Sequence, residues 1–294
     1  VLTPEMIKTG SWKTKKFRRY DVSAGVPKIY PGKKQAYIAF LDEVKQELIS
    51  MGFKEMTGPL VESSFFNFDA LYTPQDHPAR GLQDVYYVKQ PKYTKLGKYK
   101  KFLEKIKAVH ENGGETGSTG WQTEFSKKET RKLVLRSHAT PLSARTLANN
   151  PNIPGAYFSV ARVYRAEKID ATHLSEFNQC EGIVLGKDVN FRHLLGLLAK
   201  FVKKLTGAEK VRFVPGYFPY TEPSVECLVW TKNGWIELLG AGIFRPELTK
   251  PLGINVPVLA WGIGIDRLFM VKEGITDIRQ LFSSDLNWLR EAKI

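Results

Sequence analysis

A succession of short, strand-like runs fills residues 132–265 and constrains the fold more than any other feature of the sequence. The runs read KLVLRSHAT, AYFSVARVYRAE, EFNQCEGIVLG, VRFVPGYFPYTEPSVECLVW, WIELLGAGIF and VLAWGIGI. Between them only residues 190–207 show helical spacing of apolar side chains, and a further helix is expected in the tail from Ile278 onward. Strands joined mainly by loops favour an antiparallel pattern, so we expect an α+β fold with a mainly antiparallel sheet flanked by helices.

An amphipathic helix is predicted before this region, at residues 38–53. Its apolar positions recur at helical spacing, and Gly52 follows as a stop signal. They are Phe40, Leu41, Val44, Leu48 and Met51. The helix leads into a strand-like run that ends at Pro59.

Polar side chains interrupt four of the strand-like runs. Because side chains two positions apart share a face of a strand, each interruption groups two or more polar residues on one side. The groups are Arg165 with Glu167; Phe177 with Gln179 and Glu181; Phe218 with Tyr220, Glu222, Ser224 and Glu226; and Arg136 with His138 and Thr140. Burying an unpaired charge costs several kcal/mol. One shared polar cavity is therefore more economical than four separate structural ion pairs, although Arg165 and Glu167 taken alone would fit an ion pair.

The contents of such a cavity indicate its ligands. Arginines suit phosphate and carboxylate oxygens, an aromatic ring such as that of Phe177 suits a planar base, and glutamates suit a metal ion or an ammonium group. ATP together with an amino acid satisfies all three requirements.

The charge of the chain points to a polyanionic partner without requiring one. Lys+Arg number 44 against 30 Asp+Glu, which gives a net charge of +14. Two segments concentrate the lysines and arginines, and a solvated surface remains the alternative interpretation of both. They comprise Lys8, Lys13, Lys15, Lys16, Arg18 and Arg19, and then Lys89, Lys92, Lys95, Lys98, Lys100, Lys101, Lys105 and Lys107.

Location and domain organisation follow from what the chain lacks. No apolar run approaches about 18 residues, and the first residues are too polar for a secretory signal, so we expect a cytoplasmic protein without membrane contact. Cys180 and Cys227 have no metal-ligand spacing and are expected to be buried thiols. The glycine-rich stretch at residues 110–121 lacks the GxxxxGK[ST] pattern and is interpreted as a flexible connection. We expect one catalytic domain over residues 1–294, with a basic N-terminal segment (1–34) and a lysine- and glycine-rich insertion (89–120).

A family resemblance rests on motifs that span nearly the whole chain in matching order and spacing. They are LTPEMIKTGSW, MGFKEMTGPLVESSFFNFDALYTPQDHPAR, GWQTEF, LVLRSHAT, VYRAEKIDATHLSEF with QCEG, FPYTEPSVE, GAGIFRPE and GIGIDR. The chain resembles the catalytic α subunit of phenylalanyl-tRNA synthetases of the archaeal or eukaryotic cytosolic type, which are class II aminoacyl-tRNA synthetases. Class II motif one resembles residues 38–59, motif two residues 157–181, and motif three residues 262–270.

The resemblance implies roles for residues at the nucleotide end of the cavity. Arg165 would hold the α-phosphate of ATP and steer the amino-acid carboxylate, and Arg267 would bind the γ-phosphate; these two are the expected catalytic residues. Glu167 would accept a hydrogen bond from the adenine amino group, and Phe177 would stack on adenine. His173 would approach the phosphates.

The same resemblance implies an amino-acid pocket and a magnesium ion. The ammonium group of phenylalanine would be surrounded by polar side chains, and its ring would be held between two aromatic ones above a small floor residue. The expected residues are His138, Thr140, Gln179 and Glu181 for the ammonium group, Phe218 and Tyr220 for the ring, and Ala260 for the floor. Glu222 or Glu237 would help to hold Mg²⁺. The implied partners are ATP, phenylalanine, tRNA(Phe) and a β subunit, in a dimer of αβ heterodimers.

Three departures from the family pattern keep alternatives open. Gln35 and Ala36 stand where the family often has His-Pro, Asn178 where it has a histidine, and Gly81 where it has an acidic residue. The alternatives are a paralogue with changed amino-acid specificity, a paralogue that binds tRNA without catalysis, and a basic scaffold whose strand charges are structural. Phenylalanine-dependent pyrophosphate exchange separates the ligase from the other three.

Overall fold

The computed structural model describes residues 1–19, 21, 23–25, 29, 31–231 and 234–292. It divides the chain into two compact units, Val1–Lys33 and Lys34–Ile294. The first unit contains α1 (Pro4–Thr9), which begins after Thr3 and ends at Gly10, and the short 3-10 helix η1 (Ser11–Thr14). Its predicted basic side chains are exposed, and part of the predicted segment, residues 20, 22, 26–28 and 30, lies outside the described residues.

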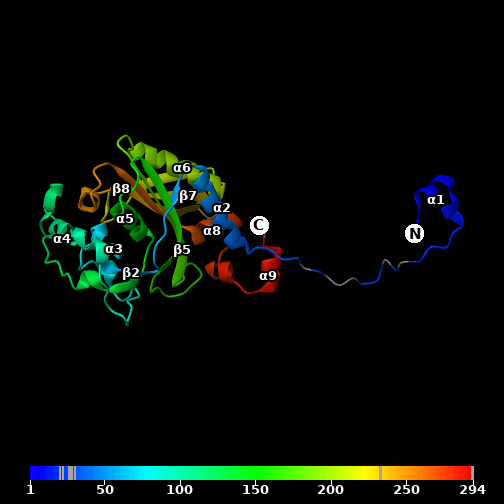
Figure 1. The fold of residues 1–294 in the computed structure, drawn as a ribbon, viewed down its shortest axis with the longest axis horizontal. Helices are drawn as coiled ribbons and strands as arrows, with labels where there is room; N and C mark the ends of the chain where they lie inside the picture. Colours follow the sequence, from blue (N-terminus) through cyan, green and yellow to red (C-terminus); the bar gives the residue numbers. More distant parts are fainter. Residues whose placement is uncertain (20, 22, 26–28, 30, 232–233, 293–294) are drawn as a thin grey trace. The chain divides into compact units, whose positions relative to one another are not determined.

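A seven-stranded sheet forms the centre of the second unit (Figure 1). Its strands lie in the order β1-β4-β5-β9-β8-β7-β6. Its strands are β1 (Lys54–Glu55), β4 (Gly155–Tyr164), β5 (Glu176–Leu185), β6 (Val211–Pro215), β7 (Thr221–Thr231), β8 (Gly234–Phe244) and β9 (Val258–Gly264). Every neighbouring pair is antiparallel except β1 with β4. The predicted mainly antiparallel sheet is therefore confirmed. A separate two-stranded sheet pairs β2 (Val61–Ser63) with β3 (Leu133–Leu135).

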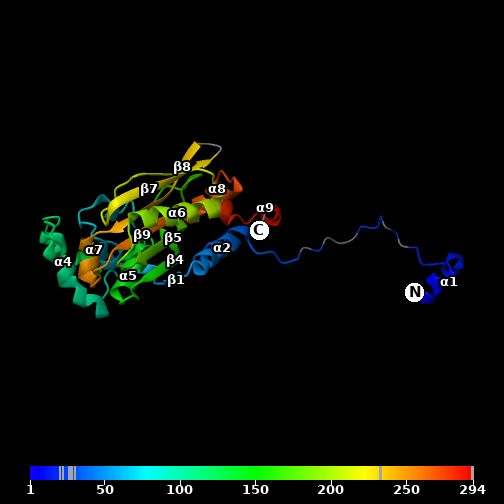
Figure 2. The same ribbon diagram turned by 90° about the horizontal axis from the view of Figure 1, so that it is seen from above.

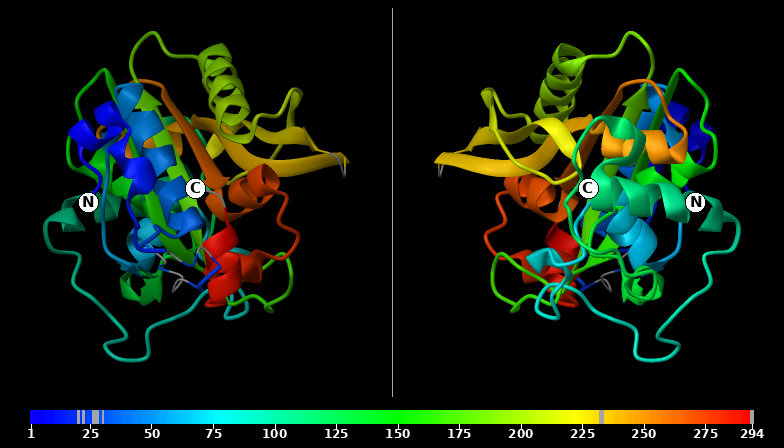
Figure 3. Two further views of the ribbon diagram at one scale, coloured as in Figure 1. Left: turned by 90° about the vertical axis from the view of Figure 1, so that its right-hand side faces the viewer. Right: turned by 90° about the vertical axis from the view of Figure 1, so that its left-hand side faces the viewer.

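Helices cover both faces of the large sheet, as the views in Figures 2 and 3 make plain. One apolar cluster joins the first face to α2 (Ala36–Ser50), α6 (Phe191–Thr206) and α8 (Ile265–Glu273). A second cluster joins the opposite face to α3 (Ser64–Asn67), α4 (Leu103–Asn112), α5 (Thr140–Ala148) and α7 (Pro246–Thr249). Strand β9 shows the alternation directly: Leu259, Trp261 and Ile263 belong to the first cluster and Ala260 to the second.

Short 3-10 helices and one last α-helix complete the second unit. They are η2 (Asp69–Leu71), η3 (Pro78–Arg80), η4 (Gly97–Phe102), η5 (Gly114–Thr116), η6 (Glu129–Arg131), η7 (Lys250–Leu252), η8 (Ile278–Phe282) and α9 (Leu286–Glu291). The tail was expected to form one helix from Ile278. It is instead broken between η8 and α9, where the Asp285 carboxylate accepts a hydrogen bond from the backbone N–H of Asn287 and starts a new helix.

Gln35 explains how the motif one helix begins without the family's His-Pro pair. Its side-chain oxygen accepts a hydrogen bond from the backbone N–H of Ile38 at 2.7 Å, which caps the first turn of α2. Its amide nitrogen donates to the carbonyl oxygen of Leu281 at 2.8 Å. The side chain therefore caps the helix and also ties it to η8.

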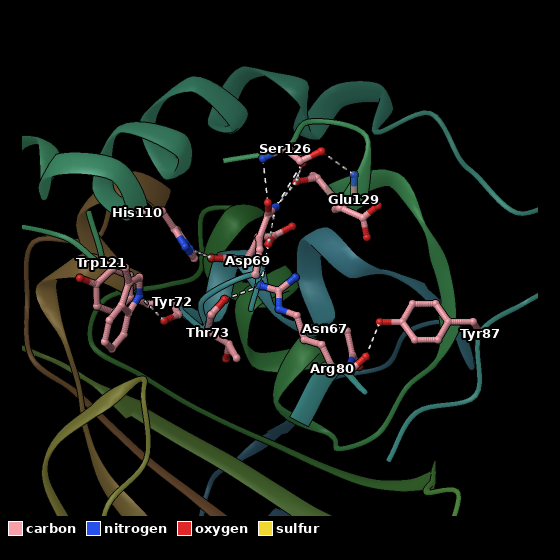
Figure 4. A network of polar contacts seen from close by, with 12 residues as sticks. Asn67, Asp69, Tyr72, Thr73, Arg80, Tyr87, His110, Trp121, Ser126 and Glu129 are labelled. Atoms are coloured by element: carbon pink, nitrogen blue, oxygen red, sulfur yellow. Dashed lines mark hydrogen bonds and ion pairs between the residues drawn. The ribbon is translucent and has the colours of Figure 1, made fainter. Parts of the chain in front are cut away.

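The glycine-rich stretch is anchored rather than loose. His110 still belongs to α4, and its Nε2 lies 2.8 Å from the carbonyl oxygen of Asp69. Trp121 donates from Nε1 to the carbonyl oxygen of Tyr72 at 3.0 Å (Figure 4). Both ends of the stretch are thus fixed to residues 69–72, which corrects the interpretation of a flexible connection.

Two further expectations concern membranes and thiols. Within the described ranges, none of the helices has the length and apolar character needed to cross a membrane. Cys180 and Cys227 are buried free cysteines, as predicted.

Candidate active site

A cavity of about 450 Å³ lies against β5, β8 and β9 and gathers almost the whole set of predicted site residues. It is lined by the predicted His138, Thr140, Arg165, Glu167, His173, Phe177, Gln179, Glu181, Phe218, Tyr220, Glu237, Ala260 and Arg267. Glu222 is exposed and does not line it. Residues from widely separated parts of the chain therefore meet in one place of a size that suits a small-molecule ligand.

A buried carboxylate defines the inner end of the cavity. Glu181 is 1% exposed and accepts hydrogen bonds from the hydroxyls of Thr140 and Ser143, both at 3.2 Å. Burial raises the pKa of Glu181 to about 8, although both hydroxyl donors act to lower it. No cation pairs with Glu181 within the described residues. A ligand cation is the partner that would favour its charged form.

His138 presents an unused acceptor to the same end. Its Nε2 lies 3.0 Å from the carbonyl oxygen of Asn67, and because a carbonyl oxygen can only accept, Nε2 carries the hydrogen. Nδ1 is buried without a hydrogen-bond partner among the described residues. Burial and the nearby Arg165 charge lower the pKa of His138 to about 4, so the ring is neutral at ordinary pH.

Gln179 is held between the loop before α5 and Glu181. Its side-chain oxygen accepts from the backbone N–H of Ala139 at 3.2 Å, and its amide nitrogen lies 3.5 Å from Glu181 Oε2. A Cβ at Gly262 on the neighbouring strand would lie 2.3 Å from that nitrogen. Gly262 therefore leaves the space that Gln179 occupies.

Aromatic rings form the wall next to this polar end. The ring centroids of Phe218 and Tyr220 are 6.2 Å apart, those of Tyr220 and His138 6.4 Å apart, and those of Tyr220 and Phe244 6.2 Å apart. A Cβ at Gly240 would come within 2.3 Å of the Phe218 ring, so this glycine is required for the position of the ring. Ala260 is paired with Gly242 on β8 and lines the cavity.

Arg165 occupies the outer end, where it is partly exposed. Strand β4 ends at Tyr164, so Arg165 and Glu167 lie in the loop after it and the predicted strand phase was wrong. They converge nevertheless, with Arg165 Nη1 3.7 Å from Glu167 Oε1 and the guanidinium 5.0 Å from the centre of the Phe177 ring. Arg165 Nε donates to the carbonyl oxygen of Ser137 at 3.3 Å. These contacts leave the guanidinium available for an anion.

A second cation and a histidine complete this end. Arg267 is exposed in the first turn of α8 and forms no ion pair within the described part of the chain. His173 Nδ1 faces Asp170 Oδ1 at 3.0 Å, which leaves Nε2 available. Hydrogen bonds from the Thr172 backbone and side chain, and from His173, lower the pKa of Asp170.

Of the two glutamates expected to hold a metal ion, only Glu237 lines the cavity. Glu237 lines the cavity, whereas the strand pairing of Thr221 with Phe244 places Glu222 far along β7 from the partner of Glu237, Leu228. An irregularity between Thr221 and Ser224 also breaks the strand phase that had grouped Glu222 with Tyr220. No cluster of three or more acidic, histidine or cysteine side chains suited to a metal occurs among the described residues. One carboxylate at the cavity does fit Mg²⁺, which in proteins is usually held by one or two carboxylates together with substrate phosphates.

A buried network links predicted motifs two and three to Tyr37 at the start of α2. Asp266 accepts hydrogen bonds from the hydroxyl of Tyr37 and from the backbone N–H of Asn178, the latter at 2.8 Å. The Asn178 amide donates to the Tyr37 hydroxyl at 2.8 Å and accepts from Arg162 at 3.3 Å. Burial raises the pKa of Asp266 to about 6. Asn178 therefore faces away from the cavity, as its strand phase predicted, and supports the turn that carries Arg267.

Arg136 was grouped with the site from the sequence but lies outside it, whereas Ser143 and Phe244 were missed. Arg136 does not line the cavity; its Nε donates to the carbonyl oxygen of Arg162 at 2.7 Å, because β3 ends at Leu135 and the predicted strand does not continue. Ser143 lies three residues after Thr140 on α5, a spacing that would have grouped it with Thr140 had the segment been predicted as a helix. Phe244 had no signal beyond the apolar end of its strand.

The chain is similar to a family of known proteins over most of its length. The family described as tRNA synthetases class II core domain (F) matches residues 19–292. The chain is 54% identical over 296 residues to the phenylalanine–tRNA ligase alpha subunit of Thermococcus kodakarensis, covering 100% of this chain and 59% of that protein. It is 51% identical over 294 residues to the same subunit from Archaeoglobus fulgidus, covering 100% of this chain and 61% of that protein. The chain thus spans about three-fifths of the length of these relatives.

The fold is also seen in a solved structure. The crystal structure of pyrrolysyl-tRNA synthetase from Desulfitobacterium hafniense matches with a TM-score of 0.60 at 19% identity, covering 85% of this chain and 74% of that chain. At this level of identity the match supports the fold alone.

Proposed function

The chain belongs to the family of class II tRNA synthetase core domains, and from this membership we propose that it activates phenylalanine with ATP and transfers it to tRNA(Phe). It acts as the catalytic α subunit of an αβ synthetase. The observation that carries the proposal is the pairing, within one cavity, of a buried Glu181 and His138 beside an aromatic wall with two arginines at the other end.

The inner end of the cavity matches phenylalanine in charge and shape. Glu181, Gln179 and the bare Nδ1 of His138 offer acceptors to an ammonium group. The side chain then extends along Phe218 and Tyr220, where aromatic rings pack edge to face or offset. Ala260 limits the space at the far edge of the ring.

The outer end matches the chemistry of adenylate formation. One carboxylate oxygen of phenylalanine forms a bond to the α-phosphorus of ATP, the bond from this phosphorus to the bridging oxygen breaks, and pyrophosphate leaves with the electron pair. Arg165 stabilises the charge that develops at the α-phosphate, and Arg267 binds the leaving phosphates. Both substrates are already ionised, so no general base is needed and catalysis consists of positioning and charge stabilisation.

Three side chains hold the nucleotide. Phe177 stacks on the adenine, Glu167 accepts from its amino group, and His173 reaches the phosphates. Mg²⁺ bound with ATP would neutralise phosphate charge, and Glu237 would be its protein ligand.

The proposed assembly and location follow from the same identification. The α subunit works with a β subunit, as a dimer of αβ heterodimers in the cytoplasm. The test is phenylalanine-dependent exchange of pyrophosphate into ATP by the full-length protein co-expressed with the β subunit. Exchange with phenylalanine supports the proposal. Exchange only with another amino acid indicates a paralogue of changed specificity, and binding of tRNA without exchange indicates a non-catalytic one.

Substitutions at Ala260 test the identity of the substrate. Ala260→Gly enlarges the floor and is expected to admit para-chlorophenylalanine, whereas Ala260→Val fills it and is expected to raise the phenylalanine KM by at least about tenfold. A pocket of this kind separates ligands that differ by one small group by about 1 to 3 kcal/mol. The measurement is pyrophosphate exchange with phenylalanine, tyrosine and para-chlorophenylalanine. If both variants rank the three amino acids as the wild type does, Ala260 does not form the floor of the phenylalanine pocket.

The lysines of residues 89–107 are proposed to contact tRNA phosphates. Lys98, Lys100 and Lys101 are exposed around η4, where Lys98 and Lys101 also lie 5.1 Å and 4.8 Å from the ring centres of Tyr99 and Phe102. Changing all three to glutamine should weaken tRNA binding and flatten its salt dependence, with phenylalanine activation unchanged. The matched control removes three exposed lysines elsewhere, Lys187, Lys200 and Lys203. If the salt dependence of tRNA binding has the same slope in both triple variants, residues 89–107 are an ordinary solvated surface.

A further inference from the structure

Asn67 is a fully buried polar residue behind the cavity. It ends α3 and is 0% exposed. Its side-chain nitrogen donates to the hydroxyl of Ser137 at 3.0 Å, and its side-chain oxygen accepts from the backbone N–H of Ser137 at 3.2 Å. Its own carbonyl oxygen faces His138 Nε2 at 3.0 Å. One asparagine therefore makes three contacts with two successive residues of the loop at 136–139.

That loop faces both ends of the cavity. The carbonyl oxygen of Ser137 accepts from Arg165 Nε at 3.3 Å at the outer end. His138 lines the same cavity as Glu181, and its ring centroid lies 6.4 Å from that of Tyr220. The contact with the Asn67 carbonyl selects the tautomer of His138, because it requires hydrogen on Nε2 and leaves Nδ1 as a bare acceptor.

Asparagine suits this position for a chemical reason. The site needs one donor for the Ser137 hydroxyl and one acceptor for the Ser137 N–H, and a primary amide supplies both without charge. A charged carboxylate would have to be buried, and an apolar side chain would leave buried polar groups unpaired.

The segment that carries Asn67 is itself fixed by contacts of Asp69 and Thr73 with Arg80 and His110 (Figure 4). Asp69 forms an ion pair with Arg80 at 2.7 Å, in which the two side chains are 0% and 8% exposed. The carbonyl oxygen of Asp69 is also held by His110 at 2.8 Å. Arg80 donates in addition to the carbonyl oxygen of Thr73. A rigid support of this kind restricts the movement of the residues it carries.

We propose that Asn67 is a positioning residue for amino-acid recognition. It holds the loop at 136–139 so that Nδ1 of His138 accepts a hydrogen bond from the substrate ammonium group. This role rests on the proposed function, because it requires an amino-acid substrate. It differs from a role in folding alone, since it acts on the ligand through one identified side chain.

The test measures the Kd of phenylalanine and, separately, of ATP by titration calorimetry on the αβ assembly. Asn67→Ala is expected to raise the phenylalanine Kd by about tenfold, which corresponds to roughly 1.4 kcal/mol, and the ATP Kd by less than about twofold. The matched control is Thr130→Val, which also removes a fully buried hydrogen-bonding group but does not contact the loop at 136–139. Its phenylalanine Kd should equal that of the wild type.

A double-mutant cycle separates positioning from a general loss of packing. If Asn67 acts through His138, Asn67→Ala should raise the Kd by less than about twofold in a His138→Leu background, since the acceptor it orients is already gone. Should Asn67→Ala fail to fold, Ser137→Ala removes a single hydrogen bond of the same set and is expected to raise the phenylalanine Kd by about threefold.

The outcomes distinguish this role from the proposed function. A wild-type assembly that neither binds phenylalanine nor supports its exchange would overturn the proposed function. A wild-type assembly that binds phenylalanine would overturn the role of Asn67 if the variants kept the wild-type Kd. The role of Asn67 would also be overturned if Asn67→Ala raised the phenylalanine Kd equally in the wild-type and His138→Leu backgrounds.

Discussion

Replacing Arg165 with alanine is expected to lower phenylalanine-dependent pyrophosphate exchange by about two to three orders of magnitude, because it removes the charge that stabilises the α-phosphate in the transition state. The contacts of Arg165 within the protein are weak: an ion pair to Glu167 at 3.7 Å and a hydrogen bond to Ser137 at 3.3 Å. The side chain is 44% exposed, so the fold should be retained. The measurement is the exchange rate of the αβ assembly at saturating phenylalanine and ATP.

Two companion variants make this result specific. Arg165→Lys keeps the charge but loses the planar, bidentate geometry and should fall between the wild type and the alanine variant. Lys168→Ala removes one exposed positive charge from the same loop and should leave the rate unchanged. Near wild-type exchange by Arg165→Ala would refute the assignment of Arg165 to the α-phosphate.

Replacing Glu181 with glutamine is expected to raise the phenylalanine KM by at least about thirtyfold at pH 8. The variant removes the buried charge opposite the ammonium group, and the loss of one partner of such a pair costs about 2 to 5 kcal/mol. Burial raises the pKa of Glu181 to about 8, so the empty wild-type site holds a proton below that pH. An ammonium ion must displace this proton, and the wild-type KM should therefore fall by more than tenfold as the pH rises from 6 to 8.

The pH profile of the Glu181→Gln variant supplies the control. Glutamine does not ionise, so position 181 should make no contribution to the pH dependence of the variant's KM between pH 6 and 8. His138, with a pKa lowered to about 4, and Tyr220, with a pKa raised to about 12, keep their protonation states between pH 6 and 8. Asp188→Asn, which removes an exposed carboxylate outside the cavity, should keep the wild-type profile. A wild-type KM that is flat from pH 6 to 8 would contradict the role given to Glu181.

Ionisation of Glu181 should lower the free energy of unfolding, although it improves the binding of phenylalanine. Because the folded-state pKa of Glu181 is raised, the carboxyl ionises more easily in the unfolded chain. The native state therefore loses stability as the pH rises from about 4.5 toward 8. Thermal unfolding should accordingly show Glu181→Gln gaining stability relative to the wild type at pH 8 compared with pH 4.

Much of the site could be predicted because side chains alternate between the two faces of a regular β-strand, and this alternation can be counted in the sequence. On β5, the alternation of Phe177, Gln179 and Glu181 placed all three in the cavity, and Asn178 facing away from it. The alternation on β9 likewise separated Ala260 from Leu259 and Trp261. In both strands the side chains alternate across an uninterrupted ladder, so counting by two is sufficient.

Prediction failed where a strand ended or changed its register. Arg136 and Arg165 lie beyond the ends of β3 and β4, and Glu222 lies at an irregularity of β7, so their side chains do not follow the strand count. Arg165 still reaches the cavity because a loop returns it there, whereas Glu222 and Arg136 do not.

The sequence by itself determined the mainly antiparallel sheet, the helix at the start of the second unit, and the family whose motifs the chain carries, because these depend on local patterns of apolar and polar residues. Only the tertiary structure decided that no cation pairs with Glu181 among the described residues, that Nδ1 of His138 rather than Nε2 is left there without a hydrogen-bond partner, and that Asn67 contacts both Ser137 and His138. Asn67 and Ser137 are 70 residues apart in the chain, and Ser143 and Glu181 are 38 apart. The physical reason is that protonation and tautomer depend on burial and on partners brought together through space, which no local pattern in the sequence records.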